Sequence, residues 1–191
     1  MIKLNASDYI GKGAERKCYK HPNYDDKVIK VEYITKQDRN QNRLDKLYYS
    51  TLKSRNISYK HIAHYYGEVA TDQGVGAVFE YIKDYDEKNS INLEEAIKEK
   101  ILSIADVEKQ LSTLRIYLEE NNIMFGDVVL SNILCQKTAQ KIYKVVIVDG
   151  LGARRIGWKF WLQRYSKLYH RYRMKKQWKK LIFNYNELLN S

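Results

Sequence analysis

Two acidic side chains and one amide in the second half of the sequence have the types and spacing for chemistry on a phosphate group. Asp127 begins an Asp-x4-Asn spacing that ends at Asn132, on an expected loop between two short apolar strands. Asp149 follows the apolar run 145–148 and precedes a glycine. A loop carboxylate can accept a proton from a substrate, and carboxylate and amide oxygens are ligands that Mg²⁺ accepts. Ordinary turns with Asx hydrogen bonds explain the same residues, and the spacing alone leaves both interpretations open.

A second group of candidate residues lies near the N-terminus. Gly11 and Gly13 flank Lys12 between two expected strands, where glycine lets the backbone approach a phosphate closely. Lys30 stands among apolar residues on the next expected strand, so it needs an anionic partner or a route to water. Asp45, in the following expected helix, could supply that carboxylate. When each residue is taken alone, a hairpin turn, an exposed strand lysine and a solvated helix acid are the favoured explanations.

These residues need a scaffold of short strands and a few helices. Apolar residues at helical spacing and the absence of glycine and proline predict the helices, and short β-branched or apolar runs between turn residues predict the strands. The expected strands lie on both sides of a glycine turn within residues 5–20 and over 27–31, 62–69, 76–81, 123–125, 133–136 and 144–148. The expected helices cover residues 36–55, 92–101, 104–120 and the last 35 residues.

Composition excludes several classes of protein. The 191 residues are 44% hydrophobic and 30% charged, which is typical of a globular chain and not of a disordered one. Two cysteines exclude a disulfide scaffold and a four-thiolate zinc site, and we expect Cys18 and Cys135 to be buried in strands as small hydrophobic residues. No long apolar run predicts a transmembrane segment, and the N-terminus lacks the pattern of a secretory signal. The expected location is cytoplasmic.

The net charge of +11 is concentrated at the C-terminal end. Residues 1–149 hold 23 basic and 22 acidic residues, whereas residues 150–191 hold 11 basic residues and a single acid, Glu187. Aromatic residues interleave with the basic ones in this tail. Residues 153–180 could bind an anionic membrane surface, which would make the protein peripheral to the inner membrane, or a polyanion such as a nucleic acid or an acidic protein. A solvated basic face with the aromatic residues packed inward is the third interpretation.

The conjunction of features is more specific than any one of them. A glycine loop, a strand lysine, a helix acid, Asp-x4-Asn and a strand-end Asp-Gly, in this order, are typical of a protein kinase-like fold. The segments IGKGAERKCYKHP, LYYSTL, HYYGEVATDQGVGAVFEYI and NNIMFGDVVLSNILCQ carry a closer likeness. Over roughly residues 4–150 the chain resembles the bacterial PhoP-regulatory-network protein family known as YrbL, a small kinase-like family.

The resemblance implies an α+β, protein kinase-like two-lobed fold. Its N-lobe would hold an antiparallel sheet over about residues 1–82. Its minimal helical C-lobe would cover about residues 83–191 and end in a basic helical tail, 153–191. The whole chain would then be a single kinase-like domain that binds ATP with Mg²⁺.

The resemblance also implies roles for the candidate residues. Gly11 and Gly13 resemble the flap over the ATP phosphates, and Lys30 resembles the lysine that grips those phosphates, held by Asp45. Asp127 resembles the catalytic acid/base. Backbone groups of the segment from Glu80 to Ile82 resemble the hinge that holds adenine, and Asn132 and Asp149 resemble the magnesium ligands.

Four positions depart from the usual kinase pattern. Arg16 stands near the place of the third flap glycine, and Val129 replaces a lysine that neutralises the transferred phosphate. Phe125 and Gly150 replace the usual histidine or tyrosine and the usual phenylalanine. These changes are compatible with nucleotide binding but do not favour fast phosphoryl transfer.

Three functions therefore remain as hypotheses. The first is an ATP- and Mg²⁺-dependent phosphotransferase, and the second is a pseudokinase-type regulatory module with weak or no turnover. The third is a basic-tailed protein that binds nucleic acid or a membrane surface. For the phosphotransferase, the 42 residues after Asp149 offer little room to dock a peptide, so we expect the hydroxyl of a small molecule, a lipid or a glycan as the acceptor.

Overall fold

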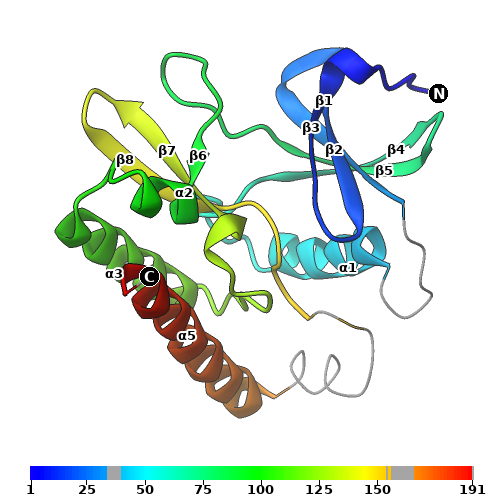
Figure 1. The fold of residues 1–191 in the computed structure, drawn as a ribbon. Helices are drawn as coiled ribbons and strands as arrows, with labels where there is room; N and C mark the ends of the chain where they lie inside the picture. Colours follow the sequence, from blue (N-terminus) through cyan, green and yellow to red (C-terminus); the bar gives the residue numbers. More distant parts are fainter. Residues whose placement is uncertain (34–39, 154, 156–165, 191) are drawn as a thin grey trace. The chain divides into compact units, whose positions relative to one another are not determined.

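An antiparallel sheet near the N-terminus is the first feature of the computed structural model (Figure 1). Its strand order is β1-β2-β3-β5-β4. The five strands are β1 (Tyr9–Lys12), β2 (Arg16–His21), β3 (Tyr24–Glu32), β4 (Tyr65–Thr71) and β5 (Gly74–Glu80). The structure describes residues 1–33, 40–153, 155 and 166–190.

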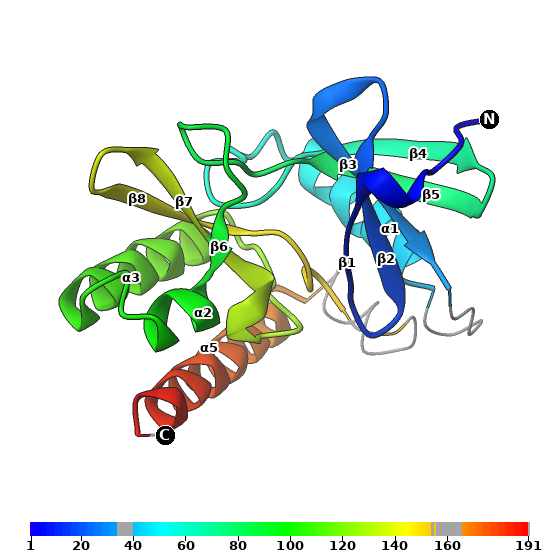
Figure 2. The ribbon, with the colours of Figure 1, turned by 45° about the horizontal axis from the view of Figure 1, so that its top comes forward.

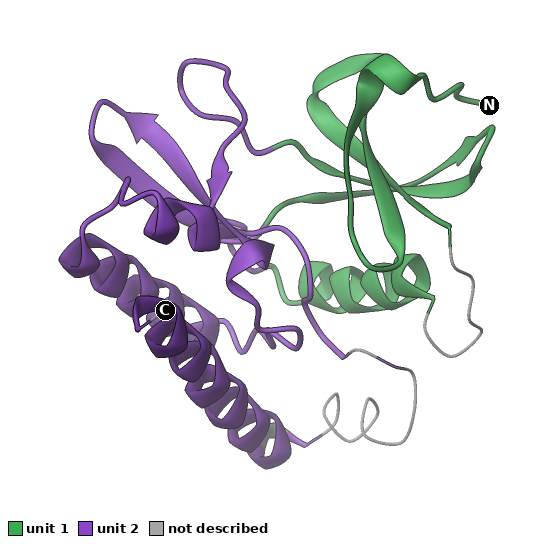
Figure 3. Ribbon diagram, in the orientation of Figure 1, with its two compact units in different colours: residues 1–56, 63–81 green, residues 57–62, 82–191 purple. Residues whose placement is uncertain are grey.

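The chain divides into two units (Figure 3). Unit 1 comprises residues 1–56 and 63–81, and unit 2 comprises residues 57–62 and 82–191. Residues 57–62 group with unit 2 because the Ile147 backbone N–H donates to the carbonyl of His61 and Ile62 forms a parallel bridge with Ile147.

The central strands β3 and β5 of unit 1 are buried on both faces of the sheet. Leu4, Tyr19, Ile29, Val31 and Val78 form a hydrophobic core on one face. Because side chains alternate along a strand, Lys30 points to the opposite face. That face is covered by helix α1 (Gln41–Ser54).

Helix α1 begins at a specific cap and buries one side. The Asn40 side chain accepts a hydrogen bond from the backbone N–H of Arg43 at 2.6 Å, which satisfies a donor at the start of the helix. The Tyr49 ring packs edge-on against Phe79 of β5, with ring centroids 5.7 Å apart. The helix therefore docks on the face that carries Lys30.

Unit 2 contains a smaller sheet and, within its described residues, three α-helices. The sheet has the order β6-β7-β8, with β6 (Ile91–Asn92), β7 (Ile133–Ala139) and β8 (Ile142–Ile147). The helices are α2 (Leu93–Lys98), α3 (Ile104–Glu120) and α5 (Lys167–Leu189). Helix α5 lies beside α3 in two views (Figures 1 and 2). The core of unit 2 includes the fully buried side chains Leu93, Leu114, Ile123, Met124, Ile133, Ile147 and Leu181.

Most expected elements are present, and several of them have different ends. The helix over 104–120 is confirmed at both ends, and Ser103 caps it by accepting from the Asp106 N–H at 3.1 Å. The strand expected over 62–69 begins only at Tyr65, because the backbone before it pairs with β8 instead. The strand expected over 123–125 is reduced to a single bridge between Phe125 and Leu151.

The other expected helices are compared with the structure over their described residues. The one expected over 36–55 is described from Gln41. The one expected over 92–101 ends at Lys98, because Lys100 has φ +53° and its N–H donates to the Ile97 carbonyl at 3.1 Å. The C-terminal helix runs over residues 167–189. Residues 154 and 156–165, in the first part of the expected tail, lie outside the described residues. The binding role expected for the aromatic and basic residues of this part stays a prediction.

Both cysteines lie in strands, as expected. Cys18 is half-buried in β2 and Cys135 is buried in β7. Burial raises the pKa of the Cys135 thiol to about 12, so this side chain stays protonated at neutral pH.

The burial of His61 leads us to expect that the stability of the protein depends on pH. The side chain is buried, and its Nδ1 lies 2.8 Å from the carbonyl oxygen of Val145 in β8. Burial lowers the pKa of His61 below 6.5, so below that pH the unfolded chain binds a proton that the folded chain does not. We expect the free energy of unfolding to fall as the pH drops from 6.5 towards the lowered pKa, by at most about 1.4 kcal/mol per pH unit for one proton.

Urea unfolding at a series of pH values from 7.5 to 5 measures this slope. Burial also lowers the pKa of His21, so a residual slope should persist in a His61→Gln variant. The exposed His64 provides the matched control, because His64→Gln should keep the full slope. A His61→Gln variant with the slope of the unmodified protein would contradict the assignment.

Candidate functional site

The loop from Gly126 to Asn132 is held in one conformation by its own hydrogen bonds. The Asn132 side-chain Nδ2 donates to the carbonyl oxygen of Asp127 at 3.0 Å, and the Asn132 backbone N–H donates to the carbonyl of Val129 at 3.1 Å. Val128 and Leu130 are buried and anchor the loop, whereas Asp127 is only half-buried. The carboxylate-bearing residue therefore lies on a fixed loop within reach of solvent.

The segment from Asp149 to Gly152 packs directly against this loop. The carbonyl oxygen of Gly150 accepts from the backbone N–H groups of Gly126 and Asp127 at 2.8 and 3.0 Å. The Gly150 N–H in turn donates to Asp149 Oδ1 at 2.7 Å. Unit 2 thus brings together the three residues that the sequence proposed for acid/base and metal chemistry: Asp127, Asn132 and Asp149.

The two glycines make this close approach possible. Gly150 has φ +79°, a left-handed conformation that glycine adopts at little cost. A Cβ atom on Gly150 would lie 2.9 Å from Asn132 Nδ2 and 2.8 Å from the Cβ of Asp127. A Cβ atom on Gly126 would lie 2.0 Å from the carbonyl oxygen of Gly152. The sequence analysis did not single out Gly126, although it stands directly before the candidate acid.

The residues of this cluster suit a hard divalent cation. Asn132 uses its side-chain nitrogen toward Asp127, so its amide oxygen remains as an acceptor. Asp149 adds a carboxylate from the facing segment, and oxygen ligands of these two kinds are typical of Mg²⁺ sites. Among the described residues there is no group of three or more His, Cys, Asp and Glu side chains that could hold a metal. A metal here would therefore need ligands beyond the protein, such as phosphate oxygens or water.

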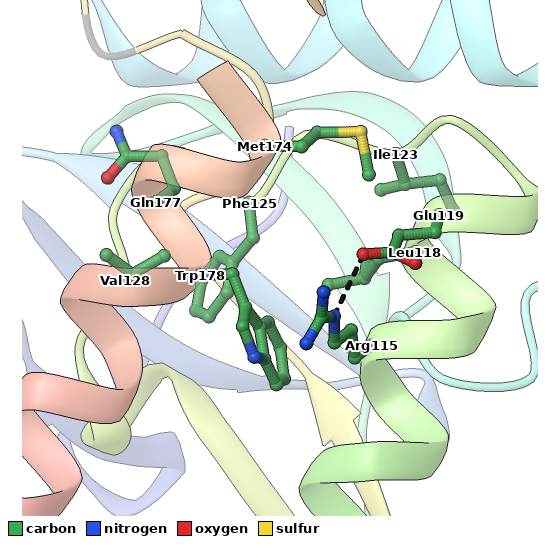
Figure 4. Close-up of a pocket in the computed structure, with 9 residues that line it drawn as sticks. All are labelled: Arg115, Leu118, Glu119, Ile123, Phe125, Val128, Met174, Gln177 and Trp178. Carbon is green, nitrogen blue, oxygen red and sulfur yellow. Dashed lines mark hydrogen bonds and ion pairs between the residues drawn. The ribbon is translucent and has the colours of Figure 1, made fainter. Parts of the chain in front are cut away.

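Helix α5 supports the same loop from the other side. Asn184 Nδ2 donates to the carbonyl oxygen of Val128 at 3.0 Å. Next to this contact, α5, α3 and the segment 123–128 enclose a small, mostly apolar pocket (Figure 4). The Arg115 and Glu119 side chains form an ion pair at its edge, with N and O atoms 2.9 Å apart. The pocket's lining consists of Arg115, Leu118, Glu119, Ile123, Phe125, Val128, Met174, Gln177 and Trp178.

Lys30 occupies the middle of the sheet in unit 1. It pairs with Cys18 of β2 and Ala77 of β5, and its side chain is buried. Its Nζ lies 4.8 Å from the centre of the Phe79 ring. A buried ammonium group needs an anionic partner or a route to water, and the role of Lys30 in gripping phosphates stays a prediction.

Asp45 forms a buried ion pair with a residue that sequence analysis did not assign to the site. Arg16 Nη1 lies 2.5 Å from Asp45 Oδ2, and both side chains are 7% exposed. The same nitrogen donates to Asn42 Oδ1 at 3.2 Å. The pairing of Asp45 with Lys30 stays a prediction. Arg16 stands two residues before Cys18 and therefore shares the face of β2 that α1 covers, but the sequence alone does not indicate that α1 docks on this face.

The glycine turn between β1 and β2 is closed by backbone and tyrosine contacts. The Gly13 N–H donates to the Arg16 carbonyl at 2.8 Å. The Tyr33 hydroxyl lies 2.8 and 2.7 Å from the carbonyl oxygens of Gly13 and Ala14, which share its single donor hydrogen. A Cβ atom on Gly11 would meet nothing within 4 Å. Packing within the protein therefore gives no reason for a glycine at position 11.

The expected hinge spans the boundary between the units. The Glu80 N–H donates to the carbonyl of His64, and the Tyr81 N–H donates to the carbonyl of Asp26, at 2.9 and 2.8 Å. Glu80 ends β5 in unit 1, and Ile82 is buried in unit 2. The role of these backbone groups in holding adenine stays a prediction.

The sheet of unit 1 with its helix, followed by a unit whose loop carries Asp-x4-Asn before a strand-end Asp-Gly, is the arrangement of a protein kinase-like fold. Solved structures agree. The chain is similar to the PknI kinase domain of Mycobacterium tuberculosis, with a TM-score of 0.53 and 12% identity over 77% of this chain. A point mutant of that domain gives a TM-score of 0.51 and 14% identity over 74% of this chain. The matches span only 59% and 57% of those kinase domains, and identity this low establishes the fold alone.

More specifically, the chain belongs to the family described as PhoP regulatory network protein YrbL, which matches residues 2–186. It is 31% identical over 181 residues to the proteins described as "Uncharacterized protein YrbL" from Escherichia coli (strain K12) and Shigella flexneri. The alignments cover 90% of this chain and 86% of each relative. The family and the kinase-like fold expected from the sequence are both confirmed.

Proposed function

We propose that the protein binds ATP with Mg²⁺ and transfers the γ-phosphoryl group to a hydroxyl of a small molecule, a lipid or a glycan. The observation that carries the proposal is the convergence of Asp127, Asn132 and Asp149 through the contacts of Gly126 and Gly150. Two glycines that admit no Cβ atom indicate that the fold is adapted to hold these three side chains together. The kinase-like fold supplies the context in which such a cluster acts on phosphate.

In the proposed reaction, Asp127 accepts the proton of the acceptor hydroxyl. The acceptor oxygen forms a bond to the γ-phosphorus while the bond from that phosphorus to the β–γ bridging oxygen breaks, and ADP leaves. Asn132 and Asp149 would hold Mg²⁺, which offsets phosphate charge when bound. The fixed loop around Asp127 lowers the barrier chiefly by orientation, because its carboxylate is in place before the reaction begins.

Unit 1 would supply the remaining contacts to the nucleotide. Lys30 would pair with phosphate oxygens, and the backbone of the turn containing Gly11 and Gly13 would approach the same phosphates. Asp45 would hold Lys30, and backbone groups from Glu80 to Ile82 would hold adenine. The open surroundings of Gly11 support this role, because a glycine without an internal packing reason is suited to close approach by a ligand.

A regulatory module that binds nucleotide without turnover is the second candidate. Arg16, near the place of the third flap glycine, favours it, because a side chain there limits how closely the backbone approaches a phosphate. Val129, in place of a phosphate-neutralising lysine, favours it as well. The two candidates share nucleotide binding and differ in turnover.

Nucleotide binding is tested by thermal unfolding with and without Mg²⁺ and ATP. At a ligand concentration of about 100 times its dissociation constant, we expect the unfolding free energy to rise by about 2.7 kcal/mol. Lys30→Ala should lose most of this gain, because the phosphates lose their buried counter-charge. Lys20 is exposed on the neighbouring strand β2, and Lys20→Ala should retain the gain.

A control must show that ATP stabilises the protein by binding at the proposed site and not by general attraction of a polyanion to basic residues. Sodium triphosphate at the same ionic strength is therefore included as a control. No stabilisation of the unmodified protein by ATP, or equal stabilisation of the Lys30→Ala variant, would contradict the proposed nucleotide site.

A further inference from the structure

Helix α5 exposes a face that the site does not use. Its inner side packs on unit 2 through Leu181 and Tyr185, which are buried, and Trp178 lines the pocket against α3 (Figure 4). On its outer side Leu168 is 81% exposed, Tyr172 is 62% exposed and Phe183 is 63% exposed. Folding of unit 2 therefore does not account for these three apolar side chains.

The three apolar residues form a line along the helix. At 3.6 residues per turn, Leu168, Tyr172 and Phe183 fall within about 60° of one another around the helix axis. We call them the apolar line. Five exposed basic residues lie in this line or on its two sides: Arg171, Lys175, Lys176, Lys179 and Lys180.

The charge of this face is positive except at its C-terminal end, where the exposed Glu187 follows Phe183 by about one turn. No acidic residue occurs between residues 167 and 186 of the sequence. Arg171 and Lys175 lie on one side of the apolar line, Lys176 and Lys180 lie on the other, and Lys179 lies within it. A central apolar line with cations on both flanks is the pattern of a helix that lies in the plane of a membrane interface.

We propose that this face of α5 binds an anionic membrane surface. The apolar line would enter the boundary between head groups and acyl chains, and the flanking cations would lie at the level of the lipid phosphates. In the part of the chain that the structure describes, no helix is long and apolar enough to cross a bilayer, so the contact would be peripheral.

A nucleic acid is the less favoured occupant of this face. Phosphates would contact the basic residues, but Leu168 and Phe183 would gain little from lying against a charged backbone. A membrane uses both kinds of residue, because apolar side chains leave water there while the cations remain hydrated. The two ligands therefore differ in whether the apolar line contributes to binding.

Co-sedimentation of the full chain with vesicles tests the proposal. We expect binding to vesicles of 70% phosphatidylcholine and 30% phosphatidylglycerol, and much weaker binding to pure phosphatidylcholine. Each basic residue contributes about fivefold to the partition coefficient, so the triple variant K175Q/K176Q/K179Q should bind roughly a hundredfold more weakly. The variant K3Q/K20Q/K53Q removes the same charge at exposed positions of unit 1 and should bind like the unmodified protein.

The apolar line is tested separately. The variant L168S/F183S keeps every charge and should lower vesicle binding by about tenfold or more, as expected for apolar surface left in water. Its circular dichroism and melting temperature verify that α5 still forms. No nucleotide is present, so the outcome is independent of the proposed phosphotransferase.

Three results would overturn the proposal. The first is no binding to the vesicles that contain phosphatidylglycerol. The second is an equal loss in the two lysine variants, which would indicate a general effect of net charge. The third is an unchanged affinity of L168S/F183S for the vesicles, especially together with tight binding of a duplex DNA or RNA probe, which would assign the face to a nucleic acid.

Discussion

Replacing Asp127 with asparagine is expected to slow phosphoryl transfer by about a thousandfold, which is within the range for the loss of a general acid or base. The side chain keeps its size but can no longer take the proton of the acceptor hydroxyl. The hydrogen bonds that Asp127 makes with Gly150, Val129 and Asn132 use its backbone N–H and carbonyl, so these bonds remain in the variant. The loss should therefore appear in the rate and not in nucleotide binding.

Production of ADP from ATP, with Mg²⁺ present, measures this rate for the hydrolytic side reaction or for a panel of hydroxyl acceptors. Asp25→Asn makes the same chemical change at an exposed position of β3 and should leave the rate unchanged. Equal rates for the Asp127→Asn variant and the unmodified protein would contradict the proposed role. ATP binding without any turnover by the unmodified protein would favour the regulatory module.

Local patterns in the sequence predicted much of this fold. The helix over 104–120 could be placed because Ser103 can cap it and because Val107, Leu111, Leu114 and Leu118 recur at helical spacing on the side that is buried. The strand containing Lys30 could be placed because β-branched residues surround the lysine. In each case the signal lies within a few residues of the element that it specifies.

Contacts between distant segments could not be read in this way. Ile62 pairs with Ile147, which removes it from the strand in which its apolar neighbours had placed it. Arg16 pairs with Asp45 only because α1 docks on one particular face of the sheet, and the docking depends on side chains from several strands. The sequence therefore identified Asp45 as a candidate partner for a cation but did not identify that Arg16 would contact it.

The candidate site combines both kinds of information. The Asp-x4-Asn spacing and the strand-end Asp-Gly are local and could be recognised directly. The role of Gly126 is not local, because it depends on the carbonyl of Gly152, which approaches from a segment beyond the β7–β8 hairpin. Without the position of the facing Gly152 carbonyl, a glycine beside an acid indicates only an ordinary turn.

Replacing Gly126 with alanine is therefore expected to destabilise the protein by about 3 kcal/mol, at the upper end of the usual cost of overpacking. The new Cβ atom would lie 2.0 Å from the Gly152 carbonyl oxygen, and a backbone oxygen cannot rotate away as a side chain can. The Gly152 N–H also donates to the carbonyl of Met124 at 2.7 Å, so the two segments must separate together. Thermal unfolding should register a fall of roughly 6–12 °C in melting temperature, since 1 kcal/mol corresponds to about 2–4 °C in a chain of this size.

Gly11→Ala is the matched control, because a Cβ atom on Gly11 meets nothing within 4 Å, and its melting temperature should change little. The site gives a second readout, since separation of the two segments breaks the bonds from Gly126 and Asp127 to the Gly150 carbonyl. Gly126→Ala should therefore also reduce the stabilisation by ATP with Mg²⁺, even at temperatures where the protein remains folded. A variant that melts like the unmodified protein would mean that the 149–152 segment moves freely from the Asp127 loop, and the convergence on which the proposed function rests would not be maintained by the fold.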